Sequence, residues 1–356
     1  MKVEPKFNWN NMDKENEQEI PSMIEYVSNA EHLSKIFGVS LTARIGKSKI
    51  LIIIPYAIIA FLSFYLGHNI LCYLLIDDDD KITQILYGDF SGILGKRIFS
   101  ILMQFVWSIH AIINLWLMKI NSPHDWLNDI EMLWYKSKDR INGWTFDNRR
   151  EYGSFMLKIR ACLFPLILTQ TTLVMIIYSI TFMNYKSVMP YYMWIIYGIK
   201  QLLWSFLSAL FSLTLMAQFC GVCHAIRIRF MEIYDDLEYI EHENRSITEL
   251  LIKQIQHKHY VALEMVMRSN QFWKKYLFQF YIIFVSMCVI ISYRIIFSDL
   301  TLSVRFICSV ITIGGFMLLS VVSIEAAVLS ISAHRPYHIV YGLMVRSDDP
   351  NIKNQV

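Results

Sequence analysis

Six long apolar stretches alternate with charged segments along the chain, and each is long enough to cross a membrane as a helix. An α-helix rises about 1.5 Å per residue, so roughly 20 apolar residues cover about 30 Å of hydrocarbon. The stretches run over residues 50–75, 99–118, 161–182, 192–222, 276–297 and 306–330. The pattern predicts an all-α, polytopic membrane protein with six transmembrane helices.

Lys and Arg residues are distributed unevenly among the segments that connect these stretches. The first 49 residues, the loop 119–160, the segment 223–275 and the end of the chain carry 26 of them, whereas the three alternate loops carry four. Positively charged loops stay on the cytoplasmic side of a membrane. We therefore expect both termini in the cytoplasm and the acidic run 77–80 outside.

Helical spacing of apolar residues continues beyond the spans on the side that we assign to the cytoplasm. In 119–160 and 223–275 it predicts helices that extend below the membrane and pack on one another. The expected organisation is a cytoplasmic N-terminal arm over 1–49, a transmembrane domain over 50–335 that includes both of these segments, and a cytoplasmic tail over 336–356.

The composition agrees with a lipid bilayer as the main solvent. Hydrophobic residues make up 55% of the 356 and charged residues 18%, and the mean hydropathy is +0.37. Soluble domains carry about 25% charged residues. The net charge of +3 comes from 33 Lys and Arg against 30 Asp and Glu, without a basic block that follows a phosphate backbone. We expect membrane lipid as a partner and no nucleic acid.

Two motifs of cysteine and histidine carry candidate chemistries, and their context argues against both. Cys220 to His224 fits the Cys-x-x-Cys-His pattern of haem attachment, but it lies at the cytoplasmic end of the fourth span, where no haem-sized pocket is implied. His334 and His338 share a helical face, as in metal-binding boxes, but Pro336 is expected to interrupt that helix. The six cysteines lie in or beside apolar runs, so we expect free thiols. We expect no catalytic residue, metal or cofactor.

Polar and aromatic residues inside the spans are the candidates for binding a ligand. A polar group is costly in hydrocarbon and usually faces a cavity or another helix. The candidates in the outer halves of the spans are Gln104, Trp107, Tyr178, Tyr197, Lys200 and Tyr293. An aromatic belt at the membrane surface, or hydrogen bonds between helices, would also account for such residues. Arg294 is expected to extend outward to the membrane surface.

Three local patterns occur in order in the second half of the chain. Arg229 and Phe230 form an Arg-Phe pair after the fourth span and precede apolar residues at helical spacing. His259 and Asn270 lie on a predicted helix that leads into the fifth span. Glu325 is followed by two alanines at the inner end of the sixth span. In this order, and with this layout of spans, the patterns resemble the arthropod gustatory receptor family, which is related to insect odorant receptors.

The resemblance implies a ligand-gated, non-selective cation channel of the plasma membrane. Such a channel binds a small-molecule tastant in the outer half of its helix bundle and assembles as a homo- or hetero-tetramer with chemoreceptor subunits. The family's seventh helix lines the pore and has a terminal signature that residues 335–356 do not match, so the fold expected here is the seven-helix chemoreceptor type with the seventh helix missing, and no pore residue is assigned. The alternative is a multi-pass transporter or a membrane enzyme of unknown substrate.

Overall fold

The computed structural model describes residues 27, 36–37, 49–77, 79–88, 97–119, 144–185, 190–242, 249–298 and 300–346. These residues form α-helices and connections, and none of them forms a β-strand. The predictions for most of the N-terminal arm, for residues 120–143 and for residues 347–356 fall outside them. The helices are α4 (Lys49–Leu75), α5 (Lys81–Leu86), α6 (Arg97–Lys119), α8 (Phe146–Tyr185), α9 (Tyr191–His242), α10 (Glu249–Phe297) and α11 (Leu302–Arg346).

Six of these helices are long and apolar enough to cross a membrane, namely α4, α6, α8, α9, α10 and α11. Every predicted span lies within one of them, so the predicted six long apolar helices are confirmed among the described residues. The short α5 lies between α4 and α6 in the chain. The chain therefore fits a multi-pass membrane protein.

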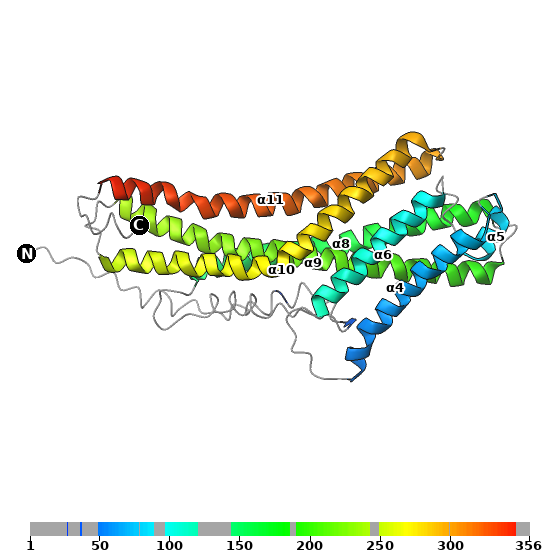
Figure 1. Ribbon diagram of the computed structural model, residues 1–356, viewed down its shortest axis with the longest axis horizontal. Coiled ribbons are helices and arrows are strands. Elements are labelled where there is room, and N and C mark those ends of the chain that lie inside the picture. The colour runs from blue at the N-terminus through cyan, green and yellow to red at the C-terminus, as the bar shows by residue number, and fades with distance from the viewer. Residues whose placement is uncertain are drawn as a thin grey trace, which may run out of the picture.

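Four helices are longer than a bilayer requires. α8, α9, α10 and α11 contain 40, 52, 49 and 45 residues, and α9 is therefore about 78 Å long. The predicted helical extensions are confirmed over 146–160, 223–242 and 249–275. Figure 1 shows α9, α10 and α11 continuing side by side to the left end of the molecule. We call this the base end, and the opposite end, which carries α5, the hairpin end.

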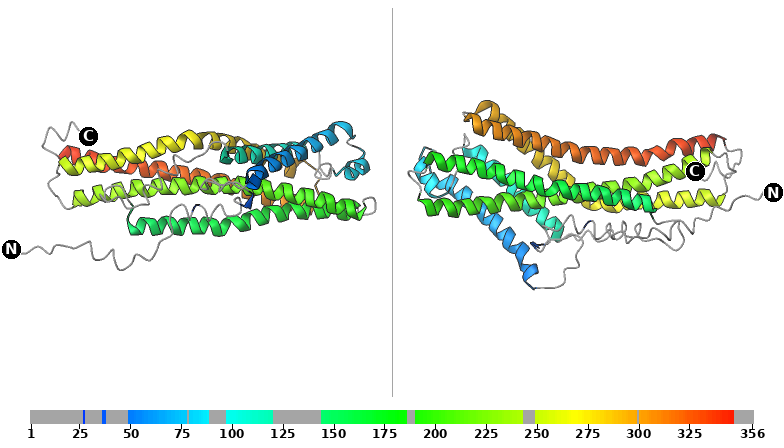
Figure 2. Two further views of the ribbon diagram at one scale, coloured as in Figure 1. Left: turned by 90° about the horizontal axis from the view of Figure 1, so that it is seen from below. Right: turned by 180° about the vertical axis from the view of Figure 1, so that it is seen from behind.

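The helix α9 forms the centre of the bundle. The share of its most apolar stretch that is buried inside the molecule is 94%, whereas the corresponding share is 22–44% in the other five long apolar helices. Its central face carries small polar residues such as Ser205, Ser208 and Ser212, all of them buried. Small residues allow helix backbones to approach closely in a membrane. Figure 2 shows α8 on one side of α9 and α10 with α11 on the other.

Two expectations about single residues are wrong. α11 continues through Pro336 to Arg346; Ser332 and Ile339, on either side of the proline, are both buried, and this packing offsets the hydrogen bond that proline cannot make. Arg294 does not extend outward, because it lies on the face of α10 that packs against α11 and is only 1% exposed.

Candidate functional site

A group of polar side chains lies between α4, α6 and α9, in the half of the bundle nearer the hairpin end. Asn69 on α4 donates through Nδ2 to Oε1 of Gln104 on α6, at 2.7 Å. The Tyr65 hydroxyl on α4 donates to Oε1 of Gln201 on α9, at 2.8 Å. We call this group the polar cluster, and its members are Tyr65, His68, Asn69, Gln104, Lys200 and Gln201. It connects three helices that are otherwise largely apolar.

The only cationic side chain in the polar cluster is Lys200, which is half-buried. Its Nζ lies 3.3 Å from Nδ1 of His68, and the ammonium is the donor of that contact. The same Nζ lies 5.2 Å from the centre of the Tyr65 ring and 5.5 Å from that of Tyr197. Aromatic faces stabilise a cation more strongly where water is scarce. The Lys200 ammonium group is therefore surrounded by one imidazole and two aromatic rings inside the bundle.

Helical periodicity brings these side chains onto facing surfaces. On α4, Tyr65 is followed by His68 and Asn69 at intervals of three and four residues, so all three share one face. On α9, Lys200 and Gln201 follow Tyr197 at the same intervals. Contacts of α4 with α9 and with α6 then bring the side chains of the three helices together.

Aromatic rings form the wall of the polar cluster that faces the middle of the bundle. The rings of Tyr65 and Trp204 stack with centroids 5.0 Å apart. Trp204 donates through Nε1 to the Ser108 hydroxyl on α6, at 2.8 Å. Trp107 is buried beside Phe284 of α10, with ring centroids 5.5 Å apart. Aromatic walls with a few polar groups are typical of small-molecule sites.

A second polar contact lies further along α6. Nδ2 of Asn114 donates to Nε2 of His110 at 3.0 Å, and Gln279 on α10 donates to Oδ1 of Asn114 at 2.5 Å. His110 and Asn114 are both fully buried. Sequence reasoning missed this contact, although polar residues four apart in an apolar helix are a signal for it. It links α6 to α10, just as the polar cluster links α6 to α4.

The short helix α5 lies against the polar cluster at the hairpin end. The Tyr197 hydroxyl donates to the carbonyl oxygen of Leu86, at 2.7 Å. The Tyr197 ring also packs on Gly88, where a Cβ atom would lie 2.6 Å from ring carbons and where φ is +72°. Only glycine adopts this conformation readily and leaves room for the ring. The connection after α4 is thus fixed to the first turns of α9.

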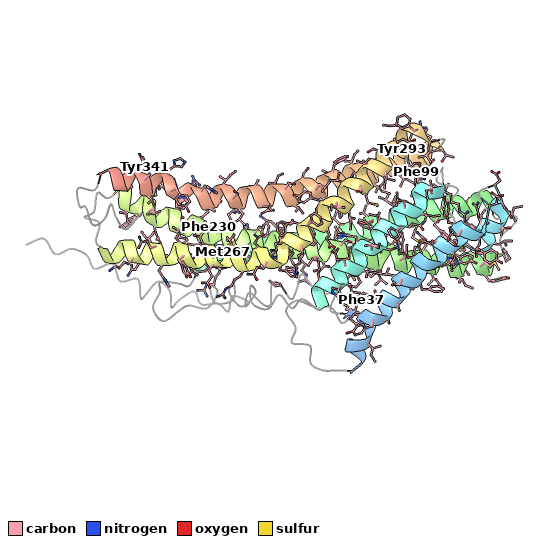
Figure 3. The ribbon with its side chains drawn as sticks, in the orientation of Figure 1. Phe37, Phe99, Phe230, Met267, Tyr293 and Tyr341 are labelled. Atoms are coloured by element: carbon pink, nitrogen blue, oxygen red, sulfur yellow. The ribbon has the colours of Figure 1, made fainter. Side chains whose placement is uncertain are left out.

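The structure brings only part of the predicted ligand set together. Gln104 and Lys200 belong to the polar cluster, Tyr197 adjoins it, and Trp107 lies deeper on α6. Tyr178 is not a member of the polar cluster; its ring packs on Gly198 of α9, and its hydroxyl donates to the carbonyl oxygen of Trp194 at 2.7 Å. Tyr293 lies apart from the polar cluster, with its ring 5.2 Å from that of Phe99; Figure 3 labels the two residues next to each other. Four cluster members absent from the predicted set are Tyr65, His68, Asn69 and Gln201, and the helical spacing on α4 is the signal that would have found three of them.

The residues that carry the family resemblance lie mostly toward the base end. Phe230 of α9 meets His259 of α10 at a centroid distance of 6.0 Å, and His259 meets Tyr337 of α11 at 5.7 Å. Figure 3 labels Phe230 in this part of the bundle. The edge-to-face arrangement of the three rings fits aromatic packing between helices. Asn270 is exposed and Glu325 half-buried.

Charged groups surround this aromatic contact. Arg229 is fully buried and donates to Glu232 at 2.7 Å. Lys258 of α10 reaches both Glu232, at 3.4 Å, and Asp236, at 2.7 Å. Since Glu232 neutralises charges from two helices, Arg229 and its partners act as a structural connection between α9 and α10.

The cysteine and histidine motifs lie within α9 and α11. All six cysteines are free thiols. The His224 ring is buried and stacks on the Phe155 ring, with centroids 3.8 Å apart. Among the described residues, no three His, Cys, Asp or Glu side chains are grouped so that they could hold a metal ion.

Comparison with known proteins gives no family for this chain. No protein-family model matches it, and no curated protein matches its sequence. The function is therefore argued from the polar cluster and from the residues of the chain itself.

Proposed function

We propose that the chain is a subunit of a chemosensory receptor of the gustatory type, which binds a small molecule at the polar cluster and gates a non-selective cation conductance. The observation that carries the proposal is the polar cluster itself. A lysine, a histidine, three amide side chains and a tyrosine hydroxyl lie beside aromatic walls in a bundle whose helices are long enough to cross a membrane. Polar groups are retained at such depth chiefly where they bind or transport something.

The proposed orientation places the hairpin end outside the cell and the base end, with both termini, in the cytoplasm of the plasma membrane. The excess of Lys and Arg in the segments of the base end supports this. A compound from outside would then reach the polar cluster beside α5. The order of the Arg229, His259 and Glu325 patterns supports the gustatory type.

The contacts of the polar cluster suggest which ligands fit and how binding is coupled to the rest of the bundle. Lys200 offers donors, and Gln104 and Gln201 offer both donors and acceptors, so a neutral or anionic polar compound fits better than a cation. Such a compound replaces hydrogen bonds that now join α4 to α6 and α9. It shifts the closed-to-open equilibrium only if it binds the open state more tightly. In this proposal α9 carries the change to the base end, and the conductance forms in a homo- or hetero-tetramer with chemoreceptor subunits.

Ligand-evoked currents in cells that express the full chain test this proposal. Sucrose, caffeine and bicarbonate are applied from outside, with and without a co-expressed chemoreceptor subunit. We expect at least one compound to evoke a current carried by Na⁺ and K⁺ alike. Accumulation of a compound in the cells without such a current would instead support the transporter alternative.

Two lysine variants locate the ligand within the protein. We expect Lys200→Met to reduce the potency of the activating compound at least about tenfold, which corresponds to about 1.4 kcal/mol of binding free energy. Lys275→Met makes the same chemical change at an exposed position on α10 and is expected to leave the potency unchanged. Equal effects of the two variants would show that the ligand does not bind at Lys200.

A further inference from the structure

Three arginines in the described part of the chain are almost completely buried, and two of them have evident partners. Arg97 donates to the carbonyl oxygens of Cys72 at 2.5 Å and Ile76 at 2.6 Å. Arg229 donates through Nη1 to Glu232 at 2.7 Å, although its Nε and Nη2 are buried without a hydrogen bond. A buried guanidinium group needs such partners, because removing its charge from water is costly. Arg97 thus has two carbonyl partners and Arg229 has a carboxylate that balances its charge.

The third buried arginine, Arg294, has no comparable partner among the described residues. It is 1% exposed, and its Nε and Nη2 atoms are buried without a hydrogen bond. The surroundings are apolar: a small cluster between α10 and α11 that consists of Ile291, Leu300, Val304 and Cys308. Burial in this cluster removes the Arg294 guanidinium group from water, and no described carboxylate compensates for the lost hydration.

The two unpartnered atoms of Arg294 are adjacent on the guanidinium group. Nε and Nη2 lie on one edge and donate in parallel, which matches the two oxygens of a carboxylate or a phosphate. Arginine is favoured over lysine wherever this paired geometry is used. The unpartnered edge therefore has the shape of an oxyanion site.

Arg294 lies in the last turn of α10, at the same end of the molecule as the start of α11. Arg294 lies one turn before the end of α10 at Phe297, and the neighbouring Tyr293 and Phe297 are 42% and 70% exposed. α11 begins at Leu302 without an acidic residue in its first turn. The first backbone N–H groups of a helix are unpaired within it and carry a partial positive charge. Arg294 and the start of α11 thus lie at the same end of the α10–α11 pair.

We propose that the hairpin end of α10 and α11 binds an oxyanion, which pairs with Nε and Nη2 of Arg294. The oxyanion comes either from the phosphate of a lipid headgroup or from a small carboxylate or phosphate in solution. This site is separate from the polar cluster and does not depend on the proposed receptor function. It stabilises the packing of α10 on α11 by neutralising the buried charge.

Thermal unfolding of the purified full chain in dodecyl maltoside, a non-ionic detergent, tests the oxyanion site. The probes are sodium phosphate, sodium benzoate and micelles mixed with phosphatidylglycerol, each compared with sodium chloride at equal ionic strength. We expect at least one probe to raise the melting temperature of the wild-type chain by about 2 °C or more, because a ligand that binds only the folded state stabilises it. A rise with phosphate or benzoate identifies a soluble anion, and a rise with phosphatidylglycerol alone identifies a lipid.

Variants of Arg294 and of a nearby arginine show whether the effect comes from the proposed site. Arg294→Met is expected to abolish the rise and, without the anion, to melt at or above the wild-type temperature, since it removes a buried unpaired charge. Arg294→Lys keeps the charge without the paired donors and is expected to show a smaller rise. Arg305→Met removes an exposed arginine of α11 and should keep the full rise.

Two results would overturn the proposal. The first is a rise that persists in Arg294→Met or disappears in Arg305→Met, which would indicate attraction to surface charge. The second is an Arg294→Met chain that is less stable than wild type, or unfolded, in chloride alone, which would show that Arg294 is already satisfied within the chain. In the second case, an equal loss of stability in Asp299→Asn would identify Asp299 as the counter-ion.

Discussion

Gly88 holds the connection after α4 in a conformation that other residues rarely adopt. Its φ is +72°, and the Tyr197 ring occupies the space where a Cβ atom would lie. We expect Gly88→Ala to lower the free energy of unfolding by at least about 1 kcal/mol, through the left-handed backbone and the displaced ring. Thermal unfolding in detergent measures the loss.

Gly314 provides the matched control for this change. It lies inside α11 with no atom within 4 Å of a built Cβ. Alanine is a better helix former than glycine by about 1 kcal/mol, so Gly314→Ala is expected to be neutral or stabilising. If both alanine variants lowered stability equally, the contact between Gly88 and Tyr197 would not be the cause.

Asp80 makes the capping of α5 depend on pH. Its carboxylate accepts a hydrogen bond from the backbone N–H of Thr83 at 3.0 Å, and hydrogen bonds from Thr83 hold the pKa of Asp80 below its usual value of 3.8. Since the pKa is lowered in the folded state, the stabilisation is present above pH 3.8 and is lost as the pH falls below it. We expect amide exchange in α5, measured relative to the intrinsic rate, to accelerate in that range. In Asp80→Asn, which keeps a capping oxygen without a charge, this acceleration should be absent.

At the level of elements, α9 is expected to contribute most of the packing energy of the bundle. Phe211 lies at its centre and is 0% exposed, whereas Phe278 on α10 is 70% exposed. We expect Phe211→Ala to destabilise the protein by about 3–5 kcal/mol, because it removes a large side chain from a filled core. Phe278→Ala makes the same change on the outer surface and is expected to stay within about 0.5 kcal/mol of wild type. Similar losses in unfolding assays of both variants would contradict the central position of α9.

The elements themselves were predictable from the sequence, and the partners of their polar residues were not. Apolar length alone places all six spans, because hydrocarbon thickness sets the minimum helix length. The same apolar pattern does not predict which helices are neighbours. Helical spacing places His68 and Asn69 on one face with Tyr65, but their partners Lys200 and Gln104 become evident only when α9 and α6 are placed beside α4.

The orientation of Arg294 also depends on tertiary packing, which the sequence pattern does not reveal. Its place near the end of a span predicts an outward side chain, since long cationic side chains usually reach the membrane surface there. The face of α10 on which it lies is turned toward α11, and only tertiary packing determines that. The prediction that Pro336 interrupts the helix is wrong for a related reason: packing on both sides of the proline keeps α11 helical.

At the scale of the whole molecule, the proposed orientation has a direct consequence for glycosylation. Asn244-Arg245-Ser246 fits a glycosylation sequon, and Asp89→Asn would create another in the connection between α4 and α6. We expect the native sequon to stay unmodified in the cytoplasm and the Asp89→Asn chain to gain a glycan that a glycosidase removes. Asp89→Gln creates no sequon and controls for the substitution. A glycan on Asn244 would reverse the orientation.

The central claim is that a small molecule binds at the polar cluster between α4, α6 and α9. The most direct measurement is a cryo-electron microscopy map of the full chain with the compound that activates it. The account predicts density for the compound beside Lys200 and Gln104, with the contact between Asn69 and Gln104 altered. Density for the compound elsewhere in the bundle, with the polar cluster unchanged, would contradict the account.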